Sequence, residues 1–139
     1  MNDTTVISTR RFRGLVGAGL IATVAAMAAT AVTAALARAV GVDFEISGAD
    51  ETIPVSGIAF VTGVFSIVGI VIAVALLRWS ARPAERFVLT AVSLTAISLV
   101  PPLLAAASTA TAAALIGLHL VAAAVMIPSL VRSLRTRAG

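Results

Sequence analysis

The only histidine of the chain lies in the middle of an apolar segment. His119 occurs in LIGLHLVAAAVMIP, residues 115–128, where it is the one ionisable side chain. A neutral imidazole donates one hydrogen bond and accepts another. Because ionisable side chains inside a membrane span are candidates for function, the chemistry of this chain depends first on what His119 contacts.

Two adjacent prolines lie close to the position expected for the partners of His119. A tight turn is predicted upstream of His119, and equal rise on both sides of it places His119 level with Ser98. Pro101 and Pro102 lack the N–H groups that would bond the carbonyls of Ile97 and Ser98. We therefore expect His119 to donate to one of these carbonyls and to accept from the Ser98 hydroxyl.

Two interpretations of His119 stay open. In the structural one, His119 restores hydrogen bonding that the prolines remove. In the functional one, His119 lines a ligand pocket or proton path with Ser98, Pro101 and Pro102. A proton path usually needs several titrating groups, and no Asp, Glu, Lys or Tyr lies inside the apolar segments. The structural interpretation is favoured, and a haem or metal site is not expected, because Met126 shares a helix with His119.

A similar arrangement is predicted lower in the same segment. Pro128 leaves the carbonyl of Ala124 without its helical donor, and Ser93 is expected at the same depth. The Ser93 hydroxyl could donate to that carbonyl. Interhelical hydrogen bonds of this kind contribute about 0.6–2 kcal/mol in membranes.

Arg38 lies at the end of the first apolar segment, away from the other arginines. The helix dipole favours a cation there, and a long side chain can reach the headgroups. We expect it to pair with Asp43 or Glu45. The alternative is a contact with an anion or a ligand headgroup at the mouth of a pocket above His119.

The loop at residues 41–54, GVDFEISGADETIP, carries an acidic cluster. Its spacing does not match an EF-hand, so a solvated outer loop without a metal is expected. The alternating polarity of residues 43–46 allows a short extended turn. The cluster consists of Asp43, Glu45, Asp50 and Glu51.

The composition indicates that a bilayer surrounds most of the chain. Of the 139 residues, 60% are hydrophobic and 12% are charged, and the mean hydropathy is +1.10. Four continuous apolar segments are each long enough to cross a bilayer as a helix. They cover residues 14–37, 55–77, 87–107 and 110–131. The predicted fold is all-α, a single-domain integral membrane four-helix bundle running up-down-up-down.

The arginines predict the orientation of the bundle. Apart from Arg38, the arginines form three groups. One group precedes the first segment, one lies between the second and the third, and one follows the fourth. The positive-inside rule places these groups, and both termini, on the cytoplasmic side of the plasma (inner) membrane. The predicted parts are a basic, loosely ordered N-terminus at 1–13, a membrane domain at 14–132 and a basic tail at 133–139.

The first segment has features of an export signal. TRRFRG precedes the apolar run, and ALA at 35–37 is similar to a cleavage site. The run is about 24 residues long, which exceeds the 7–15 residues of a signal core. We expect a retained membrane span.

Small residues recur at helical spacing in three segments. Such residues let helix backbones approach closely, which drives packing in lipid. We expect a compact bundle with a face left for a partner. The series are Ala18, Ala22, Ala26, Thr30 and Ala34; Thr62, Ser66, Gly69 and Ala73; and Ala113, Gly117, Ala124 and Pro128.

Several function classes lack their residues in this chain. It has no cysteine, no lysine and no G-x-S-x-G motif, so catalysis and a cofactor are not expected. The basic groups lack interleaved aromatic residues, which disfavours nucleic-acid binding. Small four-span multidrug exporters are similar in length only, because their membrane-embedded glutamate is absent here.

We therefore expect a non-catalytic integral membrane protein. It would be an accessory or assembly subunit, or a binder of a lipid or another apolar ligand. Its partners would be membrane lipids and a homo-oligomer or larger membrane complex. The alternative is a small transporter or channel with a pocket at His119 and Arg38.

Five segments resemble an uncharacterised family of small four-helix membrane proteins from actinobacteria. These segments are RRFRGLVGAGL, GVDFEI, IAFVTGV, SLVPPLLAA and LHLVAAAVMIP. The resemblance covers nearly the whole chain. It implies a four-span plasma-membrane protein, and it supplies no activity and no site residues.

Overall fold

The computed structural model describes residues 3–139, and its long elements are all helices. Four of these helices are long and apolar enough to cross a membrane, when the third is counted from Pro83 to Ala105. They correspond to the four predicted segments, so the all-α prediction is confirmed. The elements are α1 (Asp3–Ala39), α2 (Val55–Trp79), α3 (Pro83–Ser98), α4 (Val100–Ala105) and α5 (Thr109–Ala138).

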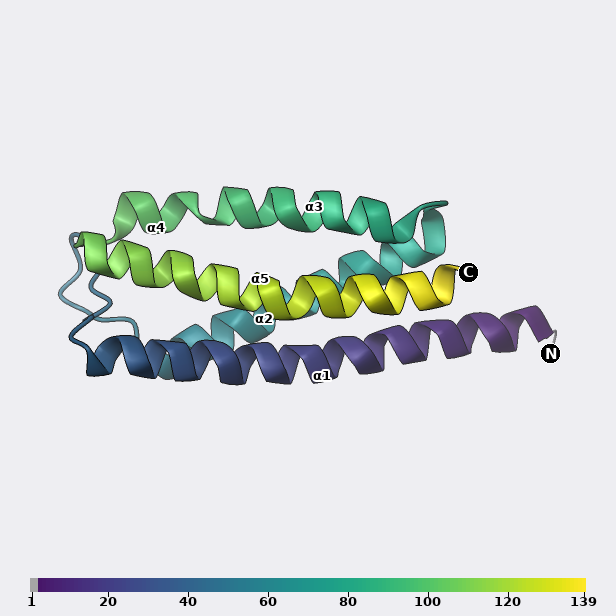
Figure 1. Cartoon of the computed structure of the whole chain (residues 1–139), viewed down its shortest axis with the longest axis horizontal. Coiled ribbons are helices and arrows are strands. Elements are labelled where there is room, and N and C mark those ends of the chain that lie inside the picture. Colours follow the sequence, from purple (N-terminus) through teal and green to yellow (C-terminus); the bar gives the residue numbers. More distant parts are fainter. Residues whose placement is uncertain (1–2) are drawn as a thin grey trace.

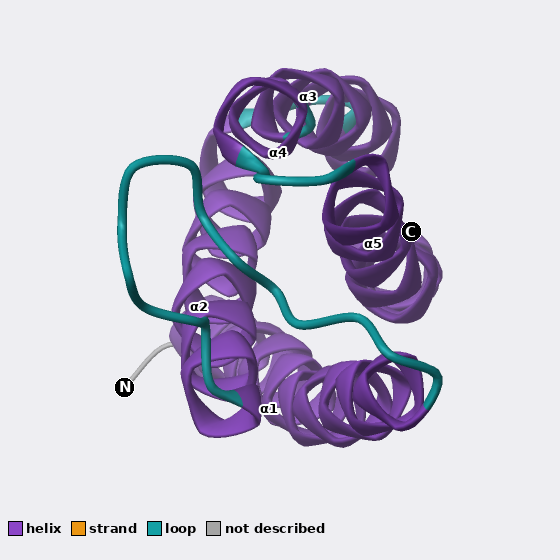
Figure 2. Cartoon of the chain, turned by 90° about the vertical axis from the view of Figure 1, so that its left-hand side faces the viewer, coloured by secondary structure: helices purple, strands orange, loops and turns teal. Residues whose placement is uncertain are grey.

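The helices lie side by side with their connections at two ends (Figure 1). One end, here called the loop end, holds the 40–54 loop and the short turn between α4 and α5. The other, the arginine end, holds both termini of the chain and the turn between α2 and α3. Within residues 3–139, α1 packs against α2 and α5, and α3 packs against the same two helices without touching α1. The view onto the loop end shows this arrangement, with the loop crossing above the helices (Figure 2).

The core is divided into two clusters along the bundle. The larger one lies toward the arginine end and includes Leu15, Ile70, Phe87 and Leu130. The smaller one lies at the loop end and consists of Ala34, Phe44, Ile58, Leu115 and Leu118. Most large side chains outside these clusters are exposed, as expected for a bundle whose outer surface faces lipid.

The third span is broken, whereas a single continuous segment over 87–107 was expected. α3 ends at Ser98 and α4 begins at Val100, with Leu99 between them. The N–H of Leu99 donates to the carbonyl of Ala96 at 3.3 Å, which closes α3 with a tight final turn. The physical cause is the pair Pro101 and Pro102, which supplies no N–H to continue the helical ladder.

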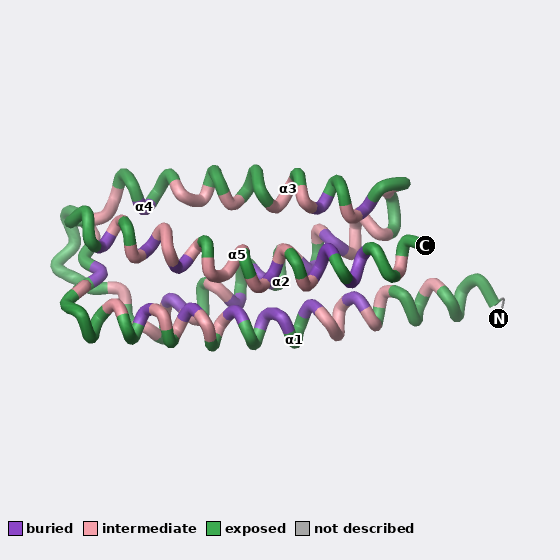
Figure 3. The backbone as a smooth tube through the Cα atoms, in the orientation of Figure 1, coloured by how far each residue is buried: buried purple, intermediate pink, exposed green. Residues whose placement is uncertain are grey.

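The basic ends are helical, so the prediction of a loosely ordered segment at 1–13 is wrong from residue 3 onward; residues 1–2 lie outside the described part. α1 contains 37 residues, which gives roughly 55 Å of helix against about 30 Å of hydrocarbon. Extending an existing helix is favourable, because only the first turn is costly. No residue of α1 before Leu15 is buried, so its first turns extend beyond the packed bundle (Figure 3).

The small residues of α1 and α2 are used inside the bundle. Ala22, Ala26, Thr30 and Ala34 are buried in α1, and Ser66 and Ala73 are buried in α2. The series on α5 differs, because Ala113, Ala124 and Pro128 are exposed. A Cβ added at Gly117 would meet no atom within 4 Å. The α5 series therefore lies on the outer surface of this chain.

Candidate functional site

His119 hydrogen-bonds to its own helix. Its Nδ1 lies 2.8 Å from the carbonyl oxygen of Leu115, one turn earlier in α5. The expected bonds to Ile97 and Ser98 are not among the hydrogen bonds of residues 3–139, so that prediction is wrong. The Leu115 carbonyl lies one turn back on the same helix, so it is available at short range whatever the neighbouring helix does.

The second nitrogen of the His119 ring remains accessible. His119 is half-buried, and Nε2 has no partner among the described residues. No side-chain nitrogen or oxygen that is fully buried in the described chain lacks a hydrogen bond. Nε2 is therefore in contact with the surroundings of the chain, where it is free to accept a hydrogen bond.

We expect the neutral ring of His119 to carry its proton on Nδ1. A carbonyl oxygen only accepts hydrogen bonds, so the atom facing Leu115 must be the donor. Nitrogen-15 NMR of the protein in lipid should show a protonated Nδ1 and a bare Nε2, and the single histidine makes the assignment unambiguous. A ring protonated on Nε2 with a bare Nδ1 would contradict this geometry. Ser98→Ala should leave the pattern unchanged.

The other residues predicted to line a pocket with His119 have surroundings of their own. The Ser98 hydroxyl donates to the carbonyl of Thr95 at 2.7 Å. Pro102 is buried and Pro101 is exposed. None of these residues lines either of the two cavities described below, and a ligand contact at them remains a prediction.

The expected pairing of Ser93 with the Ala124 carbonyl is also wrong. Both residues are exposed on the outer surface of the chain. The Ser129 hydroxyl instead donates to the carbonyl of Val125 at 2.6 Å, within α5. The hydroxyl next to Pro128, which lies inside the continuous helix α5, thus bonds along its own helix rather than across the bundle.

Arg38 contacts the loop, but not through a carboxylate. Its guanidinium donates to the carbonyl of Ile53, and its Cζ lies 5.9 Å from the centre of the Phe44 ring. The expected pairs with Asp43 and Glu45 do not form among the described residues, where the one salt bridge joins two other side chains. A backbone carbonyl and an aromatic face replace the predicted carboxylate.

The loop forms a cap with regular backbone pairing. Glu45 pairs with Thr52 in an antiparallel bridge, so the extended turn predicted at residues 43–46 is found at Glu45 and Ile46, whereas Phe44 is left-handed. Ile46 forms a second bridge with Ala106, in the turn between α4 and α5. The four acidic side chains are exposed, and no group of three or more His, Cys, Asp or Glu in residues 3–139 is arranged to hold a metal ion.

Phe44 is the residue of the loop that the sequence analysis missed. It is fully buried between α1, α2 and α5, among Ala34, Ile58 and Leu115. Its φ of 55° is left-handed, a conformation rare for a bulky residue. The signal available in the sequence was the one aromatic residue between Gly41 and Gly48, flanked directly by two acids.

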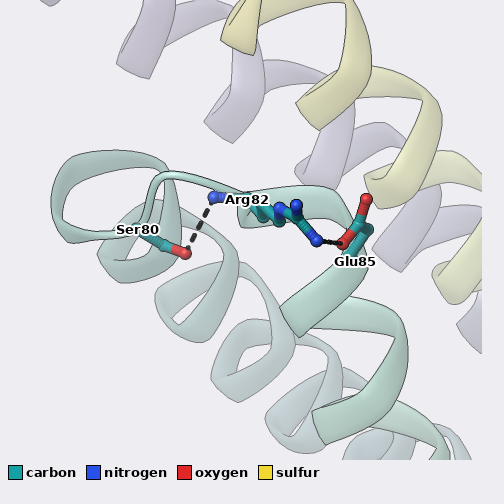
Figure 4. Close-up of polar contacts among 3 residues, drawn as sticks. All are labelled: Ser80, Arg82 and Glu85. Carbon is teal, nitrogen blue, oxygen red and sulfur yellow. Dashed lines mark hydrogen bonds and ion pairs between the residues drawn. The ribbon is translucent and has the colours of Figure 1, made fainter.

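The turn between α2 and α3 holds the salt bridge at the arginine end. Arg82 Nη1 lies 3.3 Å from Glu85 Oε2, and the Arg82 N–H donates to Ser80 Oγ (Figure 4). Both charged side chains are more than two-thirds exposed, so the pair contributes little to stability. Among residues 3–139, Glu85 pairs with Arg82 and with no other arginine.

Two cavities lie at the arginine end, at residues that the sequence analysis did not single out. The first has a volume of about 450 Å³ and lies between the start of α1 and the end of α2. The second, of about 410 Å³, lies between the start of α1 and the end of α5. Ile7 and Arg11 line both. The first is also lined by Thr4, Ser8, Phe12, Leu77, Arg78 and Trp79, and the second by Arg10, Thr136 and Arg137.

Comparison with known proteins gives one match. No curated protein and no solved structure matches the chain. A family of unknown function, DUF6069, matches residues 10–136, and this range contains all five segments quoted above for the resemblance. The chain, a small protein with four apolar helices of membrane length, therefore belongs to the DUF6069 family.

Proposed function

We propose that this protein is a non-catalytic, multi-pass protein of the plasma (inner) membrane that acts as an accessory or assembly subunit. Its helices run up-down-up-down with both termini cytoplasmic, an orientation supported by the three arginine groups. An actinobacterial origin is supported by the use of arginine for all ten basic residues, which is typical of genomes rich in G and C.

The observation that carries this proposal is the way polar side chains in the spans are satisfied. Catalysis needs a nucleophile, a base and an orienting group within reach of one another. Here the polar groups of the spans bond mainly to carbonyls of their own helices, as His119 does. The same pattern occurs at Thr23 with Gly19, Thr33 with Ala29, Thr62 with Ile58 and Ser129 with Val125.

A role in assembly is supported by the outer face of α5. Its small residues at positions 113, 117, 124 and 128 follow helical spacing and are not used inside the chain. In lipid, small residues at such spacing allow a second helix to approach closely. We take a second copy of this chain as the first partner to test.

The test is self-association in vesicles. Copies labelled with donor and acceptor dyes should show fluorescence energy transfer that rises with the protein-to-lipid ratio. Gly117→Leu should raise the dissociation constant about tenfold, which corresponds to about 1.4 kcal/mol. The added side chain meets open space within the chain, so folding should be unaffected. Ala96→Leu, an exposed site on α3, is the matched control and should associate as the wild type does. Copies that remain monomeric at every ratio would refute self-association.

The alternative function is a small transporter or channel with a pocket at His119 and Arg38. It requires both side chains to line one water-filled path. The two cavities at the arginine end are lined by neither residue. Solute flux through the purified protein in vesicles, abolished by His119→Ala, would support this alternative over the non-catalytic assembly role.

A further inference from the structure

The start of α1 presents a helix face that no other helix covers. Its lining residues Thr4, Ile7, Ser8, Arg11 and Phe12 recur every three or four positions and so share one face. Further along α1 the same face carries the buried residues that begin at Leu15. Because α2 ends at Trp79, the first turns of α1 have no α2 residue beside them. This part of the α1 face borders the first cavity instead.

The chemistry of this cavity suits a phosphate group on an apolar tail. Arg11 and Arg78 supply guanidinium groups, and Thr4 and Ser8 supply hydroxyls. The other lining side chains are apolar or aromatic, and none of the lining residues is acidic. Within residues 3–139, neither arginine forms a salt bridge with an aspartate or a glutamate. A guanidinium binds phosphate oxygens through paired N–H groups.

Both arginines are held near the cavity by weak, replaceable contacts. Arg11 Nη2 donates to the backbone oxygen of Gly139 at 3.1 Å, at an exposed site. The Arg78 Cζ lies 5.7 Å from the Trp79 ring centre. Arg11 also borders the second cavity, where Arg10 and Arg137 add positive charge. The start of α1 therefore has positively charged side chains on both sides, in the first cavity and in the second.

The location favours a lipid over a soluble ligand. The cavity begins just before the apolar part of α1 and beside the last turn of α2, where a spanning helix leaves the hydrocarbon. Trp79 is 76% exposed there, as expected for a side chain at headgroup level. We propose that the cavity between α1 and α2 binds the phosphate of an anionic phospholipid through Arg11 and Arg78. The site does not depend on self-association through α5.

The single tryptophan gives a local probe of this site. Trp79 lines the cavity, and the chain contains no other tryptophan and no tyrosine. The full chain is placed in vesicles with increasing fractions of phosphatidylglycerol or phosphatidylcholine brominated on the acyl chains. Bromine quenches fluorescence at contact range. We expect phosphatidylglycerol to be preferred at Trp79 by roughly thirtyfold, since each of the two arginines contributes about 1 kcal/mol near the surface.

Two double variants distinguish specific binding in the cavity from general attraction of anionic lipid to a basic surface. Arg11→Gln with Arg78→Gln should reduce the preference to about one. Arg13→Gln with Arg132→Gln removes the same charge from exposed positions outside both cavities and should retain most of the preference. An equal loss in the two double variants, or no preference in the wild type, would overturn the proposal.

A soluble phosphate compound is distinguished in the same experiment. Inorganic pyrophosphate is added to vesicles that contain brominated phosphatidylglycerol. We expect it not to relieve the quenching of Trp79. Relief that depends on Arg11 and Arg78 would assign the cavity to a soluble phosphate ligand and overturn the lipid assignment.

Discussion

Replacing Phe44 by alanine should destabilise the protein by about 3 kcal/mol. The side chain is fully buried and joins α1, α2 and α5 at the loop end. Truncating a buried phenylalanine removes its packing and leaves a cavity, which costs about 3–5 kcal/mol in protein cores. The left-handed backbone is no easier for alanine, so no relief of strain offsets the loss. Unfolding in mixed micelles, followed by circular dichroism, measures the change.

The matched control for Phe44 is an exposed phenylalanine. Phe65 on α2 is 68% exposed, so it faces the outside of the chain. Phe65→Ala should change the free energy of unfolding by less than about 1 kcal/mol. If Phe44→Ala is as mild as this control, the loop does not anchor the end of the bundle.

Replacing Gly19 by leucine should separate α1 from its neighbours and destabilise the protein by about 3 kcal/mol. A Cβ at Gly19 would lie 2.6 Å from Ile70 Cγ1 and 3.3 Å from Leu130 Cδ2. Both neighbours are buried core residues and have little room to move. The loss should appear as a lower midpoint of denaturation in mixed micelles. Gly19→Ala should show a smaller loss in the same direction, which keeps the test readable if the leucine variant does not fold.

Gly17, on the same helix, provides a control in which a substitution should not lower stability. A Cβ at Gly17 would meet no atom within 4 Å. Gly17→Ala should therefore leave stability unchanged or raise it by up to about 1 kcal/mol, because alanine favours the helix. Similar losses at positions 17 and 19 would mean that helix propensity, and not close packing, governs this face of α1.

Hydropathy predicted the helices well because lipid leaves the backbone few choices. The four apolar segments matched four helices, and six of the nine small residues in the α1 and α2 series are buried, with the other three half-buried. Errors arose where the chain leaves the apolar segments. The polar N-terminal stretch has no hydropathy signal, yet its spacing of Thr4, Ser8 and Phe12 continues the inner face of α1.

Side-chain partners were harder to predict than helices. The hydrogen bond of His119 was assigned by matching depths on two helices, which ignored the acceptor one turn back in α5. Phe44 was hidden by its acidic neighbours, although a phenylalanine between two glycines was visible in the loop. In both cases a short-range geometric detail decided the outcome, and a pattern averaged over a segment does not contain it.

The pairing between the 40–54 loop and the turn before α5 sets an order of events during biosynthesis. Ser47 N donates to Ala105 O at 2.8 Å, and Ala107 N donates to Glu45 O at 3.1 Å. The loop leaves the ribosome before residues 105–107, its pairing partners, have been made, and domains form as their contacts become available. The hairpin of α1 and α2 must therefore form with its loop end open, and the 40–54 loop can complete its backbone pairing only after translation has passed α4.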